Sequence, residues 1–519
     1  MKERMRTMLK QRWFRALFRW RTLIILLLLI QVAVLVYILA STSITSTIVN
    51  VILRLISFVV VVNFVVRNEK GAYKPIWIFW VLLFPVFGGL FYLFLHFQSS
   101  TKRFRRKTLL AEEKARRLLS LPCDGYEDAM RELPEHAPQV RYLQDFAGFP
   151  VYRDTKTKYL SPGEAKFEQL LIELEKAEKY IFLEYFIVQE GKMWNSILEI
   201  LKRKASEGVK VRLIYDDFGC FITLPKDYAK QMQKLGIECA VFNPFRPFLT
   251  AKQNNRDHRK IVSIDGKVAF TGGINLADEY INEYEKHGHW KDASIMVEGK
   301  AAWSLTLLFL QMWQVVTDID EDYSDYYPWT DKPCEISSEG FVLPYADSPL
   351  DKEHTGAHVY QQILLNAKDY VYICTPYLIV DDDMLGALTL AAKSGVDVRI
   401  ITPHIGDKIG VHTATRSYYR ELVEAGVKIY EYTKGFIHSK TFVSDDKIAT
   451  VGTTNLDFRS LYMHFECGIW MANSEAVMEV KEDFLDTLEI CQPITADDCR
   501  AGIFKRLIQD LLRLIAPLM

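Results

Sequence analysis

A motif that occurs twice constrains this chain of 519 residues more than any other feature. Each copy holds a histidine, a lysine two residues later, and then an aspartate, a glycine and an asparagine. The two copies keep identical spacings: His258, Lys260, Asp265, Gly272 and Asn275 in the first, and His438, Lys440, Asp445, Gly452 and Asn455 in the second. The odds that composition alone repeats five fixed residues are on the order of one in a million. The chain is therefore a duplication that carries two copies of one site.

Each copy is predicted to fold as a strand, a tight turn and a second strand, because runs rich in Ile and Val flank an Asp-Gly or Asp-Asp pair. Side chains two residues apart share one face of a strand, so each histidine projects beside its lysine. The glycines allow a close backbone approach, and Asn275 and Asn455 offer neutral donors. Such a set fits a phosphate. For Asp265 and Asp445, at the predicted hairpin tips, ordinary turn chemistry explains the residue equally well.

The spacing H-x-K-x4-D-x6-G-x2-N, present twice, resembles the signature of the phospholipase D superfamily, and the resemblance covers roughly residues 140–500. It implies duplicated phospholipase D-type α/β domains with pseudo-twofold symmetry, whose two motifs meet at one active site. It also implies phosphodiester chemistry through a phosphohistidine intermediate, with no metal and no cofactor. Asp265 and Asp445 then count among the catalytic residues, beside the histidines and lysines.

A phosphodiester needs a nucleophile, a proton for the leaving alkoxide and positive charge around its oxygens, and two histidines with two lysines supply all three. A nucleophilic imidazole attacks through one nitrogen, so its other N–H requires an acceptor that fixes the tautomer. Asp292 and Glu466 stand where the resemblance places such carboxylates; the alternative is that each is an ordinary surface acid. The resemblance favours His258 as the nucleophile and His438 as the acid and base, a choice that the symmetric sequence leaves open.

Charge and cysteine content narrow the class of protein. A net charge of −1 is unlike that of a nucleic-acid-binding protein, whose affinity comes mainly from clustered Lys and Arg. Eight cysteines without a CxxC pair predict neither a zinc site nor a disulfide framework, and they favour free thiols in a reducing cytosol.

Residues 1–107 are predicted to be a membrane anchor. After a basic start, the apolar runs at 23–40 and 48–66 are long enough to approach the thickness of a bilayer. A third run, 76–97, is broken by Pro85 and by a glycine pair, so we interpret it as re-entrant or interfacial, with three full spans as the alternative. The basic flanks favour a multi-pass protein of the cell membrane with its catalytic domains in the cytoplasm.

The rest of the chain alternates strands and helices, which predicts an α/β fold. Residues 108–160 form a polar connector, 161–330 the first phospholipase D-like domain, 341–500 the second, and 501–519 a C-terminal amphipathic helix that either docks on the protein or lies on the membrane. The first domain is expected to open on a helix with a capping box at Ser161-Pro162-Gly163-Glu164.

A membrane-tethered phosphodiester site has its expected substrate in the lipid leaflet, and phosphatidyl transfer is favoured over hydrolysis. The hydrophobic amino-terminal segment followed by two such motifs resembles bacterial cardiolipin synthases along nearly the full length. That family joins two phosphatidylglycerols and releases glycerol, which implies phosphatidylglycerol and anionic membrane lipid as partners and no nucleic acid. A lipid hydrolase or another phosphatidyltransferase is the alternative, followed by a membrane-tethered nuclease. The acceptor alcohol and the oligomeric state are left open.

Overall fold

The computed structural model describes residues 33, 37, 44–66, 74, 78–81, 99–119, 125–244, 251–330, 333–351 and 353–518. The chain divides into two compact units. The small unit comprises Met1–Arg103 with Phe245–Gln253, and the large unit comprises Phe104–Pro244 with Asn254–Met519.

The small unit contains helix α2 (Ile44–Val66), which covers the predicted apolar run at 48–66. Val60 and Phe64 of this helix pack against Val81. Among the described residues, no helix has the length and apolar character of a bilayer span. The runs at 23–40 and 76–97 lie mostly outside the described residues, so the predicted membrane anchor stays a prediction.

The large unit is built on two mixed sheets. The seven strands of the first sheet are β1 (Thr155–Leu160), β2 (Tyr180–Tyr185), β3 (Lys210–Asp216), β4 (Glu238–Phe242), β6 (Lys260–Ile264), β7 (Val268–Gly272) and β9 (Ser294–Gly299). The nine strands of the second sheet are β10 (Phe341–Asp347), β11 (Tyr370–Cys374), β13 (Asp397–Pro403), β14 (Lys428–Tyr432), β16 (Thr441–Ser444), β17 (Ile448–Gly452), β19 (His464–Ala472), β20 (Cys491–Pro493) and the short β5 (Arg256–Asp257). Two further pairs join β12 (Leu378–Ile379) to β18 (Leu456–Asp457) and β8 (His289–Lys291) to β15 (Gly435–Ile437).

The strand order shows the duplication directly. The first sheet runs β1-β9-β7-β6-β2-β3-β4, and the second runs β10-β19-β17-β16-β11-β13-β14 before it adds β20. The two sheets also match in direction: β2, β3 and β4 are parallel, as are β11, β13 and β14, and the remaining pairs in each shared order are antiparallel. The chain is thus an α/β protein with two similar domains, as the repeated motif predicts.

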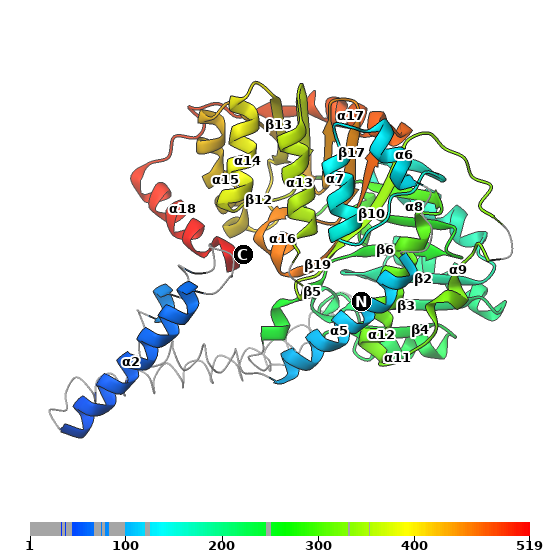
Figure 1. Cartoon of the computed structure of the whole chain (residues 1–519), viewed down its shortest axis with the longest axis horizontal. Coiled ribbons are helices and arrows are strands. Elements are labelled where there is room, and N and C mark those ends of the chain that lie inside the picture. The colour runs from blue at the N-terminus through cyan, green and yellow to red at the C-terminus, as the bar shows by residue number, and fades with distance from the viewer. Residues whose placement is uncertain are drawn as a thin grey trace. The chain divides into compact units, whose positions relative to one another are not determined.

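Helices flank both sheets (Figure 1). After α2, the α-helices of the described residues are α5 (Ser99–Leu119), α6 (Gly125–Glu132), α7 (Ala137–Arg141), α8 (Gly163–Glu175), α9 (Lys192–Ser206), α10 (Asp217–Cys220), α11 (Tyr228–Lys234), α12 (Ala302–Thr317), α13 (Thr355–Asn366), α14 (Asp382–Lys393), α15 (Ile409–Glu424), α16 (Phe458–Tyr462), α17 (Glu475–Leu488) and α18 (Ile503–Ile515). Single turns are η1 (Tyr142–Phe146), η2 (Ala251–Asn254), η3 (Asp278–Ile281), η4 (Tyr323–Tyr326) and η5 (Ala516–Leu518).

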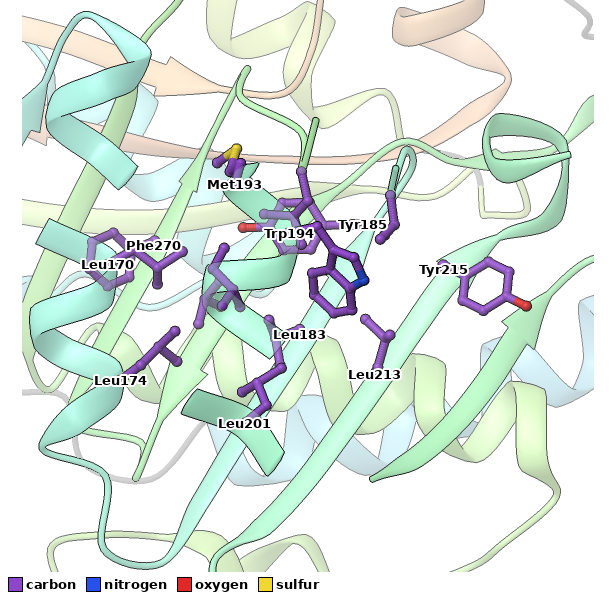
Figure 2. Packing of buried hydrophobic residues seen from close by; sticks show 14 of the residues in the cluster. Leu170, Leu174, Leu183, Tyr185, Met193, Trp194, Leu201, Leu213, Tyr215 and Phe270 are labelled. Carbon is purple, nitrogen blue, oxygen red and sulfur yellow. The ribbon is translucent and has the colours of Figure 1, made fainter. Parts of the chain in front are cut away.

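Two hydrophobic layers position the site. On one face of the first sheet, α8 and α9 pack their apolar stripes on β2, β3 and β7, and Figure 2 shows Trp194 of α9 at the centre of this cluster. A second cluster joins the two sheets, where Ile261 and Ala269 of the first meet Val443 and Val451 of the second. Because apolar residues from both domains share this layer, the two motifs are held in one rigid frame.

Residues 108–160, which we expected to be a connector, are largely part of the fold. Helix α5 buries Ala111 and Ala115 in a cluster with Trp313, and strand β1 forms the edge of the first sheet beside β9. The first domain therefore begins before residue 161. The predicted capping box does not form either: α8 starts at Gly163 without a side-chain cap, and the Ser161 hydroxyl donates instead to Asp483 of α17 at 3.1 Å.

Candidate active site

Each motif lies where a short strand passes into a hairpin. His258 stands between β5 and β6, with Lys260 as the first residue of β6, and the hairpin continues into β7. His438 stands between β15 and β16, with Lys440 directly before β16, and this hairpin continues into β17. The predicted strand, turn and strand therefore form in both halves.

The two halves exchange strands at this point. Strand β5, which precedes His258, pairs in parallel with β19 of the second half. Strand β15, which precedes His438, pairs in parallel with β8 of the first half. The backbone N–H of His258 donates to the carbonyl oxygen of Phe465 at 3.0 Å, and that of His438 donates to Lys291 at 2.7 Å. Each histidine is thus fixed by backbone from the opposite domain.

The carboxylates are exchanged in the same way, since each contacts the histidine of the other domain. His258 Nδ1 lies 2.9 and 3.0 Å from the two oxygens of Glu466, and His438 Nδ1 lies 2.7 Å from Asp292 Oδ2. All four side chains are buried. A carboxylate at Nδ1 holds the proton there and leaves Nε2 with its lone pair directed away from the carboxylate. The sequence predicted both carboxylates, and the structure shows that each serves the histidine of the other domain.

Each carboxylate has further support. The Thr453 hydroxyl donates to Glu466, and the backbone N–H of Ala293 donates to Asp292 Oδ1 at 2.8 Å. Burial raises the pKa of Asp292 to about 7, although Lys440 opposes the shift. These bonds fix the orientation of the two acids, and through them the orientation of both imidazole rings.

The two lysines are buried beside the histidines. Lys260 Nζ donates to the carbonyl oxygen of His258, and Lys440 Nζ donates to that of His438 and lies 2.8 Å from His438 Nδ1. Burial lowers the pKa of Lys260 to about 8 and that of Lys440 to about 7, against the attraction of nearby carboxylates. A bound phosphate would favour the charged form of both groups.

The electrostatics show that both motifs contribute to one centre. Burial lowers the pKa of His258 well below its usual value, and the charges of Lys260 and Lys440 lower it further. For His438 the causes are burial, then Lys440, then Lys260. The contacts of His258 with Glu466 and of His438 with Asp292 bring the two motifs into a single site, in which the lysines of both halves act on each histidine. At neutral pH these shifts keep both imidazoles uncharged, which is the form that attacks phosphorus.

The motif glycines make room for the protein's own backbone. A Cβ on Gly273 would overlap Asp292 Oδ1, and one on Gly452 would lie 2.6 Å from the carbonyl oxygen of Cys467. The sequence interpretation assigned these glycines to close approach of a ligand. Their structural effect is to let the segments that carry the carboxylates come close to the hairpins.

The motif asparagines form hydrogen bonds with protein groups around the site. Asn275 accepts from the backbone N–H of Ile187 at 3.0 Å and donates to the Tyr280 hydroxyl at 2.7 Å. Asn455 donates to Asp457 Oδ2 at 2.9 Å. Both side-chain amides are buried. Their N–H groups, which we predicted to donate to phosphate oxygens, donate to protein groups instead.

Asp265 and Asp445 lie at the opposite ends of their strands from the histidines. The Asp265 carboxylate accepts from three successive backbone N–H groups, at 178–180, and Asp445 does the same at 368–370, with distances of 2.7–3.0 Å. Both residues adopt positive φ, 52° and 53°, at the hairpin turn. The structure therefore gives them turn chemistry and does not bring them to the histidines, which corrects their placement in the catalytic set.

Sequence reasoning missed residues that shape the site. Lys408, whose side chain is 69% exposed, lowers the pKa of both catalytic histidines through its charge. His464 lies with its ring 5.5 Å from that of His258, and Trp290 occupies the matching position at 5.3 Å from His438. The signal available for the last two was their place in the sequence, each two residues before its carboxylate.

Within the described residues, one group has the spacing of a metal site: potential ligand atoms of His258, His464 and Glu466 lie within 4.8 Å of one another. Glu466 is already engaged by His258 and Thr453. The ammonium groups of Lys260 and Lys440 oppose a cation at this position. We assign no metal to the group.

Two buried histidine–carboxylate pairs with two buried lysines supply the groups that a protein needs to transfer or cleave phosphodiesters: a nucleophile, an acid and positive charge. The comparisons with known proteins give the family. The chain belongs to the family described as "Cardiolipin synthase, PLD-like domain", which matches residues 170–301 and 360–488. This confirms the resemblance found in the sequence.

Relatives match over most of their length. "Cardiolipin synthase 2" of Bacillus anthracis is 36% identical, with 87% of this chain and 88% of that protein covered. An "Uncharacterized protein" of Streptococcus mutans is 46% identical, with 88% of this chain and 99% of that protein covered. The crystal structure of phosphatidylserine synthase from Haemophilus influenzae superposes with a TM-score of 0.55 at 16% identity, covering 73% of this chain and 97% of that one, which shows a shared fold.

Proposed function

We propose that this protein is a cardiolipin synthase, which transfers a phosphatidyl group from one phosphatidylglycerol to another and releases glycerol. The observation that carries the proposal is the crossed pair of buried histidine–carboxylate dyads around two buried lysines. The curated relatives at 35–36% identity that bear the cardiolipin synthase name support the choice of substrate.

In the first half of the reaction, His258 Nε2 attacks the phosphorus of the first phosphatidylglycerol. A P–N bond forms, the P–O bond to the headgroup glycerol breaks, and His438 donates a proton to the departing oxygen. Glu466 stabilises the positive charge that develops on the His258 ring. The lysines hold the phosphoryl oxygens.

In the second half, His438 removes a proton from a headgroup hydroxyl of the second phosphatidylglycerol. That oxygen attacks phosphorus, the P–N bond breaks, and cardiolipin leaves with His258 restored. Because the deprotonating group is the one that protonated glycerol, the proton balance closes over one cycle.

The charge of the substrate makes this protonation possible. Burial and the charges of the two lysines lower the pKa of His438 and keep it neutral before substrate binds. A bound phosphodiester brings a negative charge that offsets the two ammonium groups, which raises the pKa of His438 and lets it carry the proton for glycerol. The crossed carboxylate Asp292 then stabilises the imidazolium.

We further propose that the enzyme works at the cell membrane, with the large unit on the cytoplasmic side and residues 1–107 as the anchor. The apolar runs of that segment, its basic flanks and a lipid substrate support this arrangement.

The test is to incubate the purified protein with phosphatidylglycerol in detergent and a metal chelator, and to separate the lipid products by chromatography. We expect cardiolipin and an equal amount of free glycerol, and no product from His258→Ala or His438→Ala at unchanged thermal stability. Phosphatidic acid as the sole product would make the protein a hydrolase. Unchanged lipid would contradict the proposal and direct attention to other phosphodiesters.

A further inference from the structure

The C-terminal helix α18 is amphipathic, and it turns its polar side toward the protein. It lies along α15 at the edge of the second domain (Figure 1). Arg513 donates to Glu421 Oε2 at 3.1 Å and stacks 4.4 Å above the ring of Tyr418, both on α15. Gln509 and Lys505, one and two turns earlier on the same side, line a cavity between the helix and the second sheet. Polar contacts therefore attach this helix to the body.

The apolar side points away from the protein. Ile503 and Phe504 are each 85% exposed, and Leu507 and Leu511 are 55% and 56% exposed. At 100° per residue these positions fall opposite Lys505, Gln509 and Arg513. A helix on a water-soluble protein normally buries this stripe, and none of the residues of α18 is buried. The exposed stripe is therefore a docking surface.

Charge and length identify the occupant as a lipid surface. The helix carries three basic groups, Lys505, Arg506 and Arg513, and one acidic group, Asp510; since Arg513 pairs with Glu421 of α15, a net charge of +1 is left for lipid head groups. With 13 residues it is about 20 Å long, too short to cross a bilayer and suited to lying in its surface. A basic helix with an aromatic and aliphatic face binds in this way to anionic head groups and upper acyl chains.

The position of the helix relates the surface to the active site. The turn η5 that follows α18 packs on α16, which begins three residues after Asn455. Helix α15, on which α18 lies, begins directly after Lys408, whose charge reaches both catalytic histidines. The turn that ends α18 is thus linked through α16 to the segment that carries the second motif.

We propose that the outer face of α18 lies flat on an anionic lipid leaflet and holds the active site at the level of the head groups. Docking itself is independent of the reaction, and only its benefit to catalysis rests on the proposed function. The helix is a second membrane contact of this chain, separate from the predicted amino-terminal anchor.

The direct test uses the full-length protein in vesicles of phosphatidylglycerol and phosphatidylcholine with brominated acyl chains. A fluorescent amino acid replaces Leu507 in one sample and Leu390 of α14, which is equally exposed at 55%, in the other. Brominated chains should quench the probe at Leu507 severalfold more than the probe at Leu390. Equal quenching at the two positions would overturn the proposal.

The functional test compares L507Q/L511Q with L365Q/L390Q, a control pair that has the same exposures of 56% and 55% on α13 and α14. In vesicles the first variant should need at least tenfold more phosphatidylglycerol per unit surface for half-maximal rate, and the control should match the wild type. On a short-chain, water-soluble phosphatidylglycerol all three should be equal. A first variant that matches the control in vesicles would contradict docking.

Two other outcomes separate the alternatives. If L507Q/L511Q converts a dimer into a monomer in detergent and the Leu507 probe is not quenched by lipid, a second copy of the chain covers the face, and the lipid proposal fails. Selective quenching at Leu507 in a wild-type protein that makes no cardiolipin would support docking and refute the proposed function alone.

Discussion

Replacing Glu466 by glutamine tests the crossed arrangement of the site. The change keeps the size of the side chain and removes the negative charge that lies 2.9 and 3.0 Å from His258 Nδ1. If the acid of the second domain serves the nucleophile of the first, the attack on phosphorus should slow.

The expected fall in the rate of attack follows from two losses of stabilisation in Glu466→Gln. A hydrogen bond to a charged group is worth about 1.5 kcal/mol more than a neutral one, and the new amide NH₂ can donate to Nδ1 and favour the wrong tautomer, at a further cost of about 1.5 kcal/mol. Together these amount to about 3 kcal/mol, or roughly a 100-fold fall in the rate of attack. Thr453→Val, which removes only the hydroxyl that donates to Glu466, should cost about fivefold.

The assay uses a phosphatidyl ester of p-nitrophenol, whose leaving group needs no proton. The initial burst of nitrophenol then reports attack by His258, and the steady rate reports resolution assisted by His438. Glu466→Gln should slow the burst about 100-fold. Asp292→Asn should leave the burst within about threefold of the wild type and slow the steady rate by a similar factor of about 100.

Either of two results would refute this reasoning. A Glu466→Gln protein with a normal burst would show that the carboxylate does not support the nucleophile. The reverse pattern, with the burst slowed by Asp292→Asn, would make His438 the nucleophile. Unfolding midpoints must match for all variants, since both carboxylates are buried.

Four other predictions concern residues around this centre. The value of kcat/KM should fall as pH rises through about 7 to 8, because Lys440 and Lys260 lose the protons that hold the phosphate. In a pH–rate profile, Lys440→Arg should move this fall to higher pH. A fall at unchanged pH would argue against the assignment of it to Lys440. Gly273→Ala should lower kcat more than tenfold with a native circular dichroism spectrum, because its Cβ displaces Asp292. Asp265→Ala should lower the free energy of unfolding in urea by about 2–4 kcal/mol yet keep the activity of the folded protein, whereas a dead but stable variant would restore its catalytic role. Lys408→Gln should raise KM for phosphatidylglycerol severalfold with little change in kcat, and steady-state kinetics with unchanged KM would exclude a substrate contact.

The site was predictable in its composition and not in its connections. The spacing of the motif residues was enough to predict both hairpins. His258 and His438 are buried because Ile- and Val-rich strands lie beside them. The pairing of His258 with Glu466 joins residues 208 positions apart. It depends on the parallel register of β5 with β19, for which the two-residue strand β5 carries no local signal.

Elsewhere, tertiary contacts overrode local patterns. Strand β1 is half exposed at the edge of the first sheet, so its alternating lysines resemble a polar connector. Ser161 has the sequence of a helix cap, but Asp483 from α17 offers its hydroxyl an acceptor in the other domain. For Asp265 and Asp445 the sequence left turn chemistry and catalysis open, and the three N–H groups that each carboxylate accepts from, at the strand end away from the histidine, decide for the turn.

The central claim is that two motifs form one site in which His258 carries the phosphatidyl group. The most direct measurement is to quench the reacting His438→Ala protein with the p-nitrophenol ester, digest it under alkaline conditions that preserve phosphohistidine, and map the modified peptide by mass spectrometry. The account predicts one phosphatidyl group per chain, on His258. Modification at any other residue, or an unmodified protein after a full burst, would contradict it.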